Sequence, residues 1–323
     1  MKPVPWVFVT GAPRSGTTFV GKMLSLPRSV DYIHEPFNPH CGIPGLDTRF
    51  IWADGRAPWP EGDRLISPLF DYRVKLRTGM YPEDDWRRRV IKTVVGSRGP
   101  FYMRLAKLNR WRTDVVLTDP IGVLLTEYLA QRHGVSPVIM VRHPAAVAAS
   151  YKRLGWPVRL EALRNQPELV ERYFPDRDDL RSSGNVVEDA ARLWRALHVV
   201  MADQLDRNPD WTVLRHEDLN ASPVQTLRDL YDSLGLPWSE SVGRRIEEMT
   251  SGGNRAEAQG SKVQDFRRDS GALFQLRLKG LTEAERGTVL EVAGAVGSRW
   301  YSEASYGVGA GMDGCTETAM ASA

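Results

Sequence analysis

The chain of 323 residues is long enough to bury a substantial core, either as one large α/β domain or as two small ones. Hydrophobic residues make up 42% and charged residues 26%, as in ordinary soluble enzymes, and no apolar run approaches the ~20 residues that span a bilayer. We recognise no signal peptide, and the two cysteines, Cys41 and Cys315, lie far apart, so we expect a reduced, cytoplasmic protein.

The net charge of +3 is unevenly distributed along the chain. Residues 86–112 contain nine Lys or Arg and no Asp or Glu, which leaves −6 for the remainder (+3 less +9). Such a stretch is either a solvated helix surface or a docking surface for an anionic ligand or acceptor. Nucleic acid is a weaker option, because no binding motif accompanies the charge.

In chain order, the first predicted strand covers residues 7–10, and a helix with apolar residues on one face is predicted at 17–26. Residues 30–33 are predicted to form a second short strand. Residues 38–80 are rich in Pro, Gly and Trp without a clear period, so a long loop or lid is expected there. Basic helical segments are predicted to follow as far as about residue 111.

Regular alternation of strands and helices resumes after residue 112. Strands are predicted at 114–118, 138–141 and 211–214. Helices are predicted at 121–132, 144–154, 187–207, 222–235 and from a capping box at Thr282 and Glu285 to about residue 301. Buried strands that alternate with helices predict a mostly parallel sheet covered on both faces, whose ligands bind at the carboxyl ends of the strands.

The stretch GAPRSGTT (residues 11–18) has the glycine spacing of a phosphate-binding loop. A nucleotide triphosphatase has Lys where this chain has Thr17, whereas here the cation is Arg14, inside the loop. The backbone N–H groups predicted to form an anion cradle in front of the helix are those of Ser15, Gly16, Thr17 and Thr18. The lysine that reaches the β- and γ-phosphates is missing. The loop therefore indicates binding of a terminal phosphate and argues against hydrolysis of a nucleoside triphosphate.

This loop resembles the 5′-phosphosulfate loop of sulfotransferases that use 3′-phosphoadenosine 5′-phosphosulfate (PAPS). Its PRSGTT core is similar to that of tyrosylprotein, carbohydrate and many bacterial members. The resemblance implies a P-loop-like three-layer α/β fold, PAPS as the sulfuryl donor and adenosine 3′,5′-bisphosphate (PAP) as its product. It also implies that Arg14 and the loop amides neutralise the leaving 5′-phosphate, and we expect no metal ion.

The family's second signature binds the 3′-phosphate through an Arg at a strand end and a Ser eight residues later. VIMVRHPAAVAASYKRLGW places Arg142 and Ser150 at that spacing, and a guanidinium at a strand end can bind phosphate with two hydrogen bonds. A later segment, FRRDSGALFQLRLKGLTEAE, resembles the closing segment of bacterial members. It adds Arg267, Arg268 and Ser270 as further contacts to the 3′-phosphate, with a solvated loop as an equal alternative.

In HEPF, Glu35 matches the Glu that acts as base in tyrosylprotein sulfotransferases. An acceptor hydroxyl must lose its proton as sulfur is attacked, and a carboxylate near a strand end can take it. The alternative is a structural carboxylate before a proline turn. His34 is a local rival, His133 falls where cytosolic members carry a histidine base but reads as a helix-end residue, and His143 is interpreted as structural.

One position departs from the family pattern. Tyrosylprotein and many bacterial members place a Lys that contacts the transferring group before Asp-Pro in the middle strand, but VVLTDPIG has Thr118 there. Either the Thr118 hydroxyl donates a weaker hydrogen bond, or a lysine from elsewhere, such as Lys75 or Lys92, replaces the missing one.

The sequence thus predicts a single domain over residues 1–303, with an acceptor-side insertion at about 38–112 and a disordered tail at 304–323. The expected reaction is sulfuryl transfer to the hydroxyl of a small-molecule or carbohydrate acceptor. The basic stretch at residues 86–112 favours an anionic acceptor. Trp52 and Trp59 are candidates to stack on a sugar or aromatic ring. Neither nucleic acid nor a membrane span is expected, and the oligomeric state is open.

Two rival functions remain at this point. A P-loop kinase for small molecules would use ATP, with Asp119 as the metal-binding carboxylate. A catalytically degenerate protein would keep the fold and bind the nucleotide without turnover, for which Thr118 is the main sign. The six histidines and two cysteines form no metal-ligand spacing.

Overall fold

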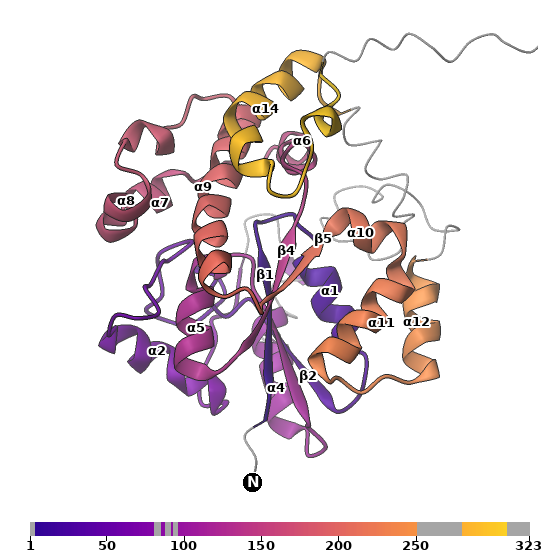
Figure 1. The fold of residues 1–323 in the computed structure, drawn as a ribbon. Helices are drawn as coiled ribbons and strands as arrows, with labels where there is room; N and C mark the ends of the chain where they lie inside the picture. The colour runs from indigo at the N-terminus through magenta and orange to yellow at the C-terminus, as the bar shows by residue number, and fades with distance from the viewer. Residues whose placement is uncertain (1–3, 81–84, 88–91, 93–95, 251–279, 309–323) are drawn as a thin grey trace, which may run out of the picture.

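The computed structural model describes residues 4–80, 85–87, 92, 96–250 and 280–308. Within them, five strands form one sheet in the order β2-β3-β1-β4-β5, and each pairing is parallel (Figure 1). The strands are β1 (Trp6–Gly11), β2 (Val30–His34), β3 (Asp114–Thr118), β4 (Ser136–Val141) and β5 (Thr212–Arg215). The predicted α/β fold with a central parallel sheet is confirmed.

The central strand β1 is buried along its whole length, between β3 and β4. Its side chains alternate between the two faces of the sheet, as strand geometry requires. Phe8 packs into the core on one face, and Val7 and Val9 pack into the core on the other. Both faces are therefore covered, which explains the continuous apolar run in the sequence.

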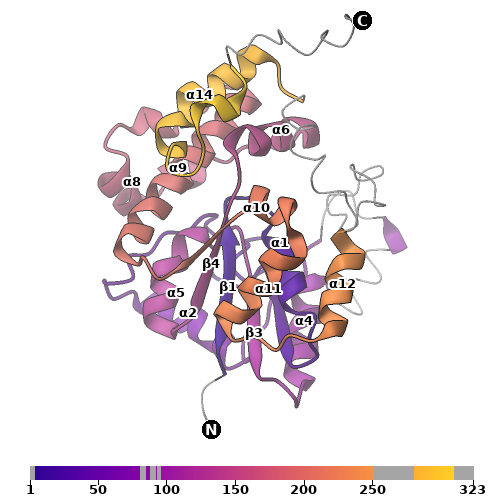
Figure 2. The same cartoon turned by 45° about the vertical axis from the view of Figure 1, so that its right-hand side comes forward.

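Three groups of helices surround the sheet (Figures 1 and 2). One face carries α1 (Thr17–Leu24), α10 (His216–Ala221), α11 (Pro223–Leu234) and α12 (Glu240–Thr250). The other carries α2 (Pro60–Phe70), η1 (Val123–Leu125), α5 (Thr126–His133) and, beside the edge strand β2, α4 (Arg98–Leu108). Above the carboxyl ends of the strands in Figure 2 lie α6 (Pro144–Leu154), α8 (Pro167–Tyr173), α9 (Val186–Arg207) and α14 (Glu283–Gly297). The short helices α7 (Glu161–Arg164) and η2 (Arg177–Leu180) belong to this last core.

Two predicted segments differ from the structure. The expected loop at 38–80 contains the helix α2, whose apolar period is obscured by Gly62 and by Pro68 inside the helix. The helix predicted at 121–132 is divided, because the Asp119 carboxylate binds the N–H groups of Ile121 and Gly122 and the regular helix begins only at Thr126.

The folded part of the chain extends past residue 303, where the sequence predicts a disordered tail. A 3₁₀ helix, η3 (Glu303–Tyr306), follows α14, and Tyr306 is 1% exposed because its ring packs against His143. Residues 309–323 lie outside the described part. The predicted capping box before α14 is present, with Thr282 and Glu285 each binding the other's backbone N–H.

None of the described helices is both long and apolar enough to cross a membrane.

Candidate functional site

The loop between β1 and α1 has a strained, tightly folded backbone. Gly11, Arg14 and Gly16 all have positive φ, of 149°, 74° and 98°. A Cβ atom on Gly11 would lie 2.2 Å from the carbonyl oxygen of Met140, so only glycine allows β1 and β4 to approach in this way. Strain of this kind persists where the surrounding structure enforces it, and it is concentrated at binding sites.

The cradle is formed by fewer amides than the sequence predicts. The N–H of Ser15 binds the carbonyl oxygen of Ala12 at 3.1 Å, so it closes the loop instead of facing a ligand. No side chain caps α1, and the N–H groups of Thr17 and Thr18, at its first two positions, have no intrahelical acceptor. The Ser15 hydroxyl is buried and has no hydrogen-bond partner among the described residues. These donors suit the oxygens of an anion at the N-terminus of α1.

The structure brings together three predicted site residues from two neighbouring strand ends. Arg14 Nε donates to Ser150 Oγ at 3.1 Å, and an Nη1 of Arg142 donates to the carbonyl oxygen of Arg14 at 2.7 Å. The guanidinium of Arg14 also lies over the ring of Trp156, 5.3 Å from its centroid. Trp194 Nε1 holds the carbonyl oxygen of Arg142 at 2.8 Å, which fixes the end of β4.

Arg142 is the buried cation of this group, with only 3% of its surface exposed. Its Nε is buried without a hydrogen-bond partner, and no carboxylate in the described part of the chain forms an ion pair with it. A buried charge without a counterion costs several kcal/mol unless an anion completes the site. The unpartnered Nε of Arg142 and the unpartnered Ser15 hydroxyl therefore fit a phosphate-bearing ligand.

Glu35 lies at the end of β2, with β3 between it and β1. Strand spacing puts the two strands roughly 10 Å apart. Its backbone has φ of 46°, its N–H binds the carbonyl oxygen of Thr118, and its Oε2 accepts a 2.7 Å hydrogen bond from the Asn38 amide. His34 Nε2 lies 3.8 Å from Oε1, and burial lowers the pKa of His34, which favours the neutral imidazole beside the carboxylate.

Lys22 in α1 joins this second region, and the sequence interpretation missed it. Its Nζ lies 3.6 Å from the ring centroid of Tyr32 and 3.5 Å from that of Tyr102. Burial, and then the positive charge of Arg98, lowers the pKa of Lys22 to about 7. The sequence signal was a lysine within an apolar helical run, directly after Gly21.

Gly21 explains how α1 reaches the Thr118 position. A Cβ atom on Gly21 would lie 1.9 Å from Thr118 Oγ1, so helix and strand pack together with no side chain between them. Of the two lysines predicted to replace the missing one, Lys75 is exposed to solvent, and Lys92 stands between undescribed residues. Among the described lysines, Lys22 is the one held against the residues next to Glu35.

The sequence analysis also did not identify His216, the first residue of α10. A Cβ atom on Gly16 would lie 2.9 Å from His216 Cδ2, so the ring packs directly on the phosphate-binding loop. Its Nδ1 faces the Asn220 amide at 2.9 Å. Burial, and then the charge of Arg14, lowers the pKa of His216 to about 4, so the ring is neutral at pH 7.

Three residues considered as rivals have structural roles. Both oxygens of Asp119 accept backbone hydrogen bonds, from Phe37 at 2.6 Å and from Ile121 at 2.8 Å, and burial followed by the charge of Glu35 raises its pKa to about 8. His133 stacks on Phe70 at the end of α5, next to the start of β4. His143 caps α6 by accepting from the Ala145 N–H, and burial lowers its pKa to about 4. The described residues contain no group of three His, Cys, Asp or Glu placed to hold a metal ion.

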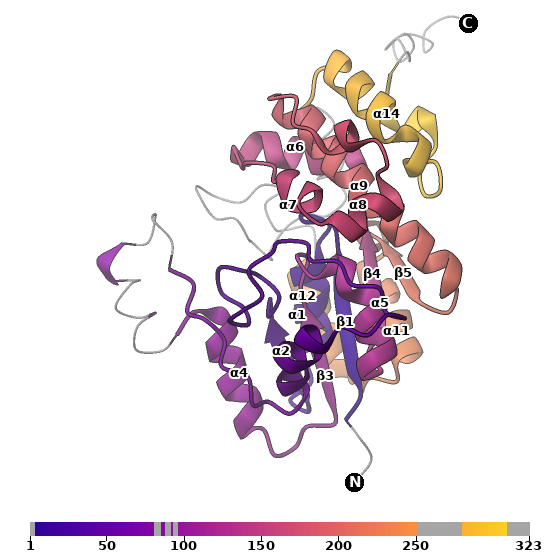
Figure 3. The same ribbon diagram turned by 90° about the vertical axis from the view of Figure 1, so that its left-hand side faces the viewer.

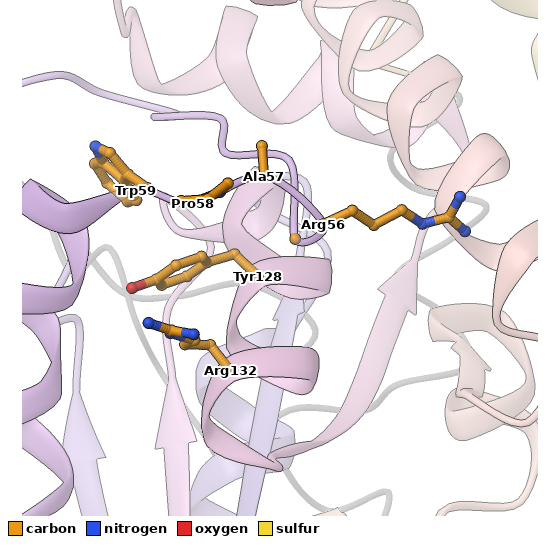
Figure 4. Close-up of a pocket in the computed structure, with 7 residues that line it drawn as sticks. Arg56, Ala57, Pro58, Trp59, Tyr128 and Arg132 are labelled. Atoms are coloured by element: carbon orange, nitrogen blue, oxygen red, sulfur yellow. The ribbon is translucent and has the colours of Figure 1, made fainter.

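The tryptophans predicted to stack on an acceptor pack on tyrosines of the protein. The ring centroids of Trp52 and Tyr173 lie 6.0 Å apart, and those of Trp59 and Tyr128 lie 5.3 Å apart. A pocket of about 260 Å³ lies between residues 55–59 and α5 (Figure 4). Tyr128 and Arg132 line it and no residue of the β1–α1 loop does, so it is separate from the cradle. The predicted residues Arg267, Arg268 and Ser270 lie outside the described part of the chain.

Comparison with known proteins places this geometry in a family. A family model described as the sulfotransferase family matches residues 5–240, well over half of the chain. No curated protein matches. Similar solved structures include the sulfotransferase STF9 from Mycobacterium avium, with 13% identity, 93% of this chain and 78% of that chain covered, and a TM-score of 0.43. The sulfotransferase domain of the Synechococcus PCC 7002 olefin synthase has 18% identity and a TM-score of 0.40, with 91% of this chain and 94% of that chain covered. Retinol dehydratase in a complex with retinol and PAP has 18% identity and a TM-score of 0.44, with 92% of this chain and 82% of that chain covered. On the extent of the family match, the chain belongs to the sulfotransferase family.

Proposed function

We propose that this protein transfers a sulfuryl group from PAPS to a hydroxyl of a small-molecule or carbohydrate acceptor. The observation that carries the proposal is the hydrogen-bonded group of Arg14, Arg142 and Ser150 beside the amides at the N-terminus of α1. Bound there, the donor would supply an activated sulfuryl group on a phosphate leaving group. The cradle provides positive charge at two points, as a ligand with separate 5′- and 3′-phosphates requires.

On the donor side, the loop holds the 5′-phosphate and neutralises charge as that phosphate leaves. The N–H groups of Gly16, Thr17 and Thr18 and the guanidinium of Arg14 supply the donors. Preorganised groups of this kind usually make the largest catalytic contribution. Arg142 and Ser150 hold the 3′-phosphate and so orient the donor. Arg267, Arg268 and Ser270 are proposed as further contacts to that phosphate.

On the acceptor side, Glu35 takes the proton of the attacking hydroxyl. The Asn38 amide fixes Oε2, so the carboxylate is oriented by a hydrogen bond before the acceptor arrives. His34 Nε2 lies 3.8 Å from Oε1, and burial lowers the pKa of this histidine, so its ring is neutral beside the proposed base. Lys22 lies beneath this region and supplies positive charge near the position where the family pattern has its lysine.

The kinase alternative is disfavoured by the state of Asp119. Its two oxygens are already bound by three backbone N–H groups, so the carboxylate is committed to shaping the turn before η1. The loop also lacks the lysine that contacts β- and γ-phosphates.

The decisive experiment is calorimetric titration with PAP, and separately with ATP and Mg²⁺. It should be done on the wild type, on Arg142→Ala and on the control Arg153→Ala, an exposed arginine in the same helix region. We expect PAP to bind the wild type and the control, with affinity for Arg142→Ala lower by about tenfold or more, as for a lost hydrogen bond to a charged group. Tighter binding of ATP with Mg²⁺ than of PAP, with equal ATP affinity in the wild type and Arg142→Ala, would overturn the proposal.

Turnover is tested separately, with labelled PAPS and a panel of hydroxyl acceptors. Transfer of label to one acceptor class supports the reaction and identifies the substrate. PAP binding without transfer to any member of a broad panel would indicate a degenerate nucleotide-binding protein instead.

A further inference from the structure

The helix α4 has one face in the protein and one face in water. Its buried residues are Gly99, Pro100, Met103 and Ala106. On the opposite side, Phe101, Leu105 and Leu108 are 38%, 48% and 77% exposed, and Trp111, just after the helix, is 78% exposed. The spacing of four and three residues aligns Phe101, Leu105 and Leu108 in one row on the helix, and we name this row together with Trp111 the apolar stripe.

Positive charges lie beside this apolar stripe. At 100° per residue, Arg104 lies about 60° and Lys107 about 120° from Phe101 on one side of the helix. Both are exposed, as is Arg110 between the helix and Trp111. No acidic residue occurs anywhere from residue 86 to 112.

An exposed row of large apolar side chains costs free energy in water and usually marks a surface that binds a partner. The charge selects the partner. In a symmetric dimer through this face, Arg104 and Lys107 would approach their own copies or each other, and like charges side by side oppose association. The complementary partner is apolar where it meets the stripe and negative along its borders.

We propose that α4 and the turn after it bind reversibly to the surface of an anionic lipid bilayer. Leu105, Leu108 and Trp111 enter the boundary between headgroups and acyl chains, and the flanking basic residues lie among the headgroups. Amphipathic helices with Phe, Leu and Trp on one face and Lys and Arg around it bind interfaces in this way. A Trp at the edge of the stripe suits the same boundary, because its ring is apolar and its N–H is polar.

The position of α4 allows this contact and connects it to the candidate site. Figure 3 shows α4 at one side of the molecule, and its residues Phe101, Leu105 and Leu108 are exposed to solvent. On its inner side, the Tyr102 ring packs edge-to-face on Tyr32 at 4.8 Å and covers Lys22. A Cβ atom on Gly99 would lie 3.3 Å from the carbonyl oxygen of His34. Binding through the apolar stripe would therefore hold the end of β2 beside the lipid.

The test is flotation of the full chain with vesicles of phosphatidylcholine and phosphatidylglycerol, compared with phosphatidylcholine alone. We expect binding to the anionic vesicles that weakens as salt increases, because exposed charges are screened. The double variant Leu105→Ser/Leu108→Ser should reduce binding about tenfold or more, because two leucine side chains would no longer leave water on binding. Arg104→Gln/Lys107→Gln should remove the preference for anionic vesicles.

The control is Val213→Ser/Val308→Ser, which removes two other exposed apolar side chains, 38% and 37% exposed, away from α4. PAP binding and the melting temperature should be unchanged in every variant, so a lost fold or a failed donor site is distinguishable from lost membrane binding. No binding to anionic vesicles, or equal binding by the leucine variant, would overturn the proposal. So would a dimer in light scattering that Leu105→Ser/Leu108→Ser dissociates, because the stripe would then be an interface between copies.

Discussion

The donor side and the acceptor side of the candidate site are built in different ways. At the ends of β1 and β4, a short contiguous motif sets the backbone, and Arg14, Arg142 and Ser150 meet through direct hydrogen bonds. At the end of β2, residues from separate elements pack together: Lys22 from α1 lies over the rings of Tyr32 from β2 and Tyr102 from α4. The first region is thus determined mainly by local backbone geometry, and the second by packing between elements that are far apart in the sequence.

The largest effect on turnover should come from Glu35→Gln. This substitution tests the acceptor side without changing the donor side. Removing a positioned base costs about 10²–10⁴-fold in rate, whereas the donor cradle contains no atom of Glu35. We expect turnover to fall by that factor with PAP affinity within about twofold of the wild type. Steady-state rates and calorimetry provide the comparison, with Glu61→Gln, an exposed carboxylate, as control. Full turnover of Glu35→Gln across pH would show that another group is the base.

Arg14→Ala should have a smaller effect on turnover than Glu35→Gln, but it should weaken PAP binding as well. Loss of one preorganised donor to a developing anion costs about 10²–10³-fold in turnover. The substitution also removes the contacts to Ser150 and Trp156, so PAP should bind more weakly too. Arg28→Ala is the matched control, since Arg28 is exposed beyond the C-terminal end of α1. Unchanged turnover with weakened PAP binding would confine Arg14 to binding.

Lys22→Met should act on the pH dependence of stability. The pKa of Lys22 is about 7 in the folded protein and 10.5 in an unfolded chain, so the unfolded state holds more protons between these values. The free energy of unfolding of the wild type should therefore rise as pH increases from about 7 toward 10.5. This rise should be smaller in Lys22→Met and unchanged in Lys75→Met, an exposed lysine. Denaturant titrations at pH 7, 8 and 9 measure it, and parallel curves for wild type and Lys22→Met would contradict the burial of this ammonium.

The same contrast explains what the sequence predicts well. The strands were predicted to within two residues at each end, because their buried, β-branched runs are bounded by glycines and polar residues. Arg14, Arg142 and Ser150 could be predicted to lie together because their spacing follows one strand and one helix. Lys22 and His216 were missed because their partners, Tyr102 and Gly16, lie far along the chain, and spacing does not reveal such contacts. The helix α2 was missed since Pro68 and Gly62 interrupt its pattern.

Gly21 has a consequence for how this chain can diverge. Since no atom fits between Gly21 and Thr118 Oγ1, a longer side chain at 118 requires α1 to move outward, and a longer side chain at 21 requires position 118 to shrink. Positions 21, 22 and 118 are therefore expected to be substituted together in evolution. Restoring lysine at 118 alone should be poorly tolerated, and a directed-evolution search for suppressors of Thr118→Lys should recover changes in the turn of α1 that carries Lys22.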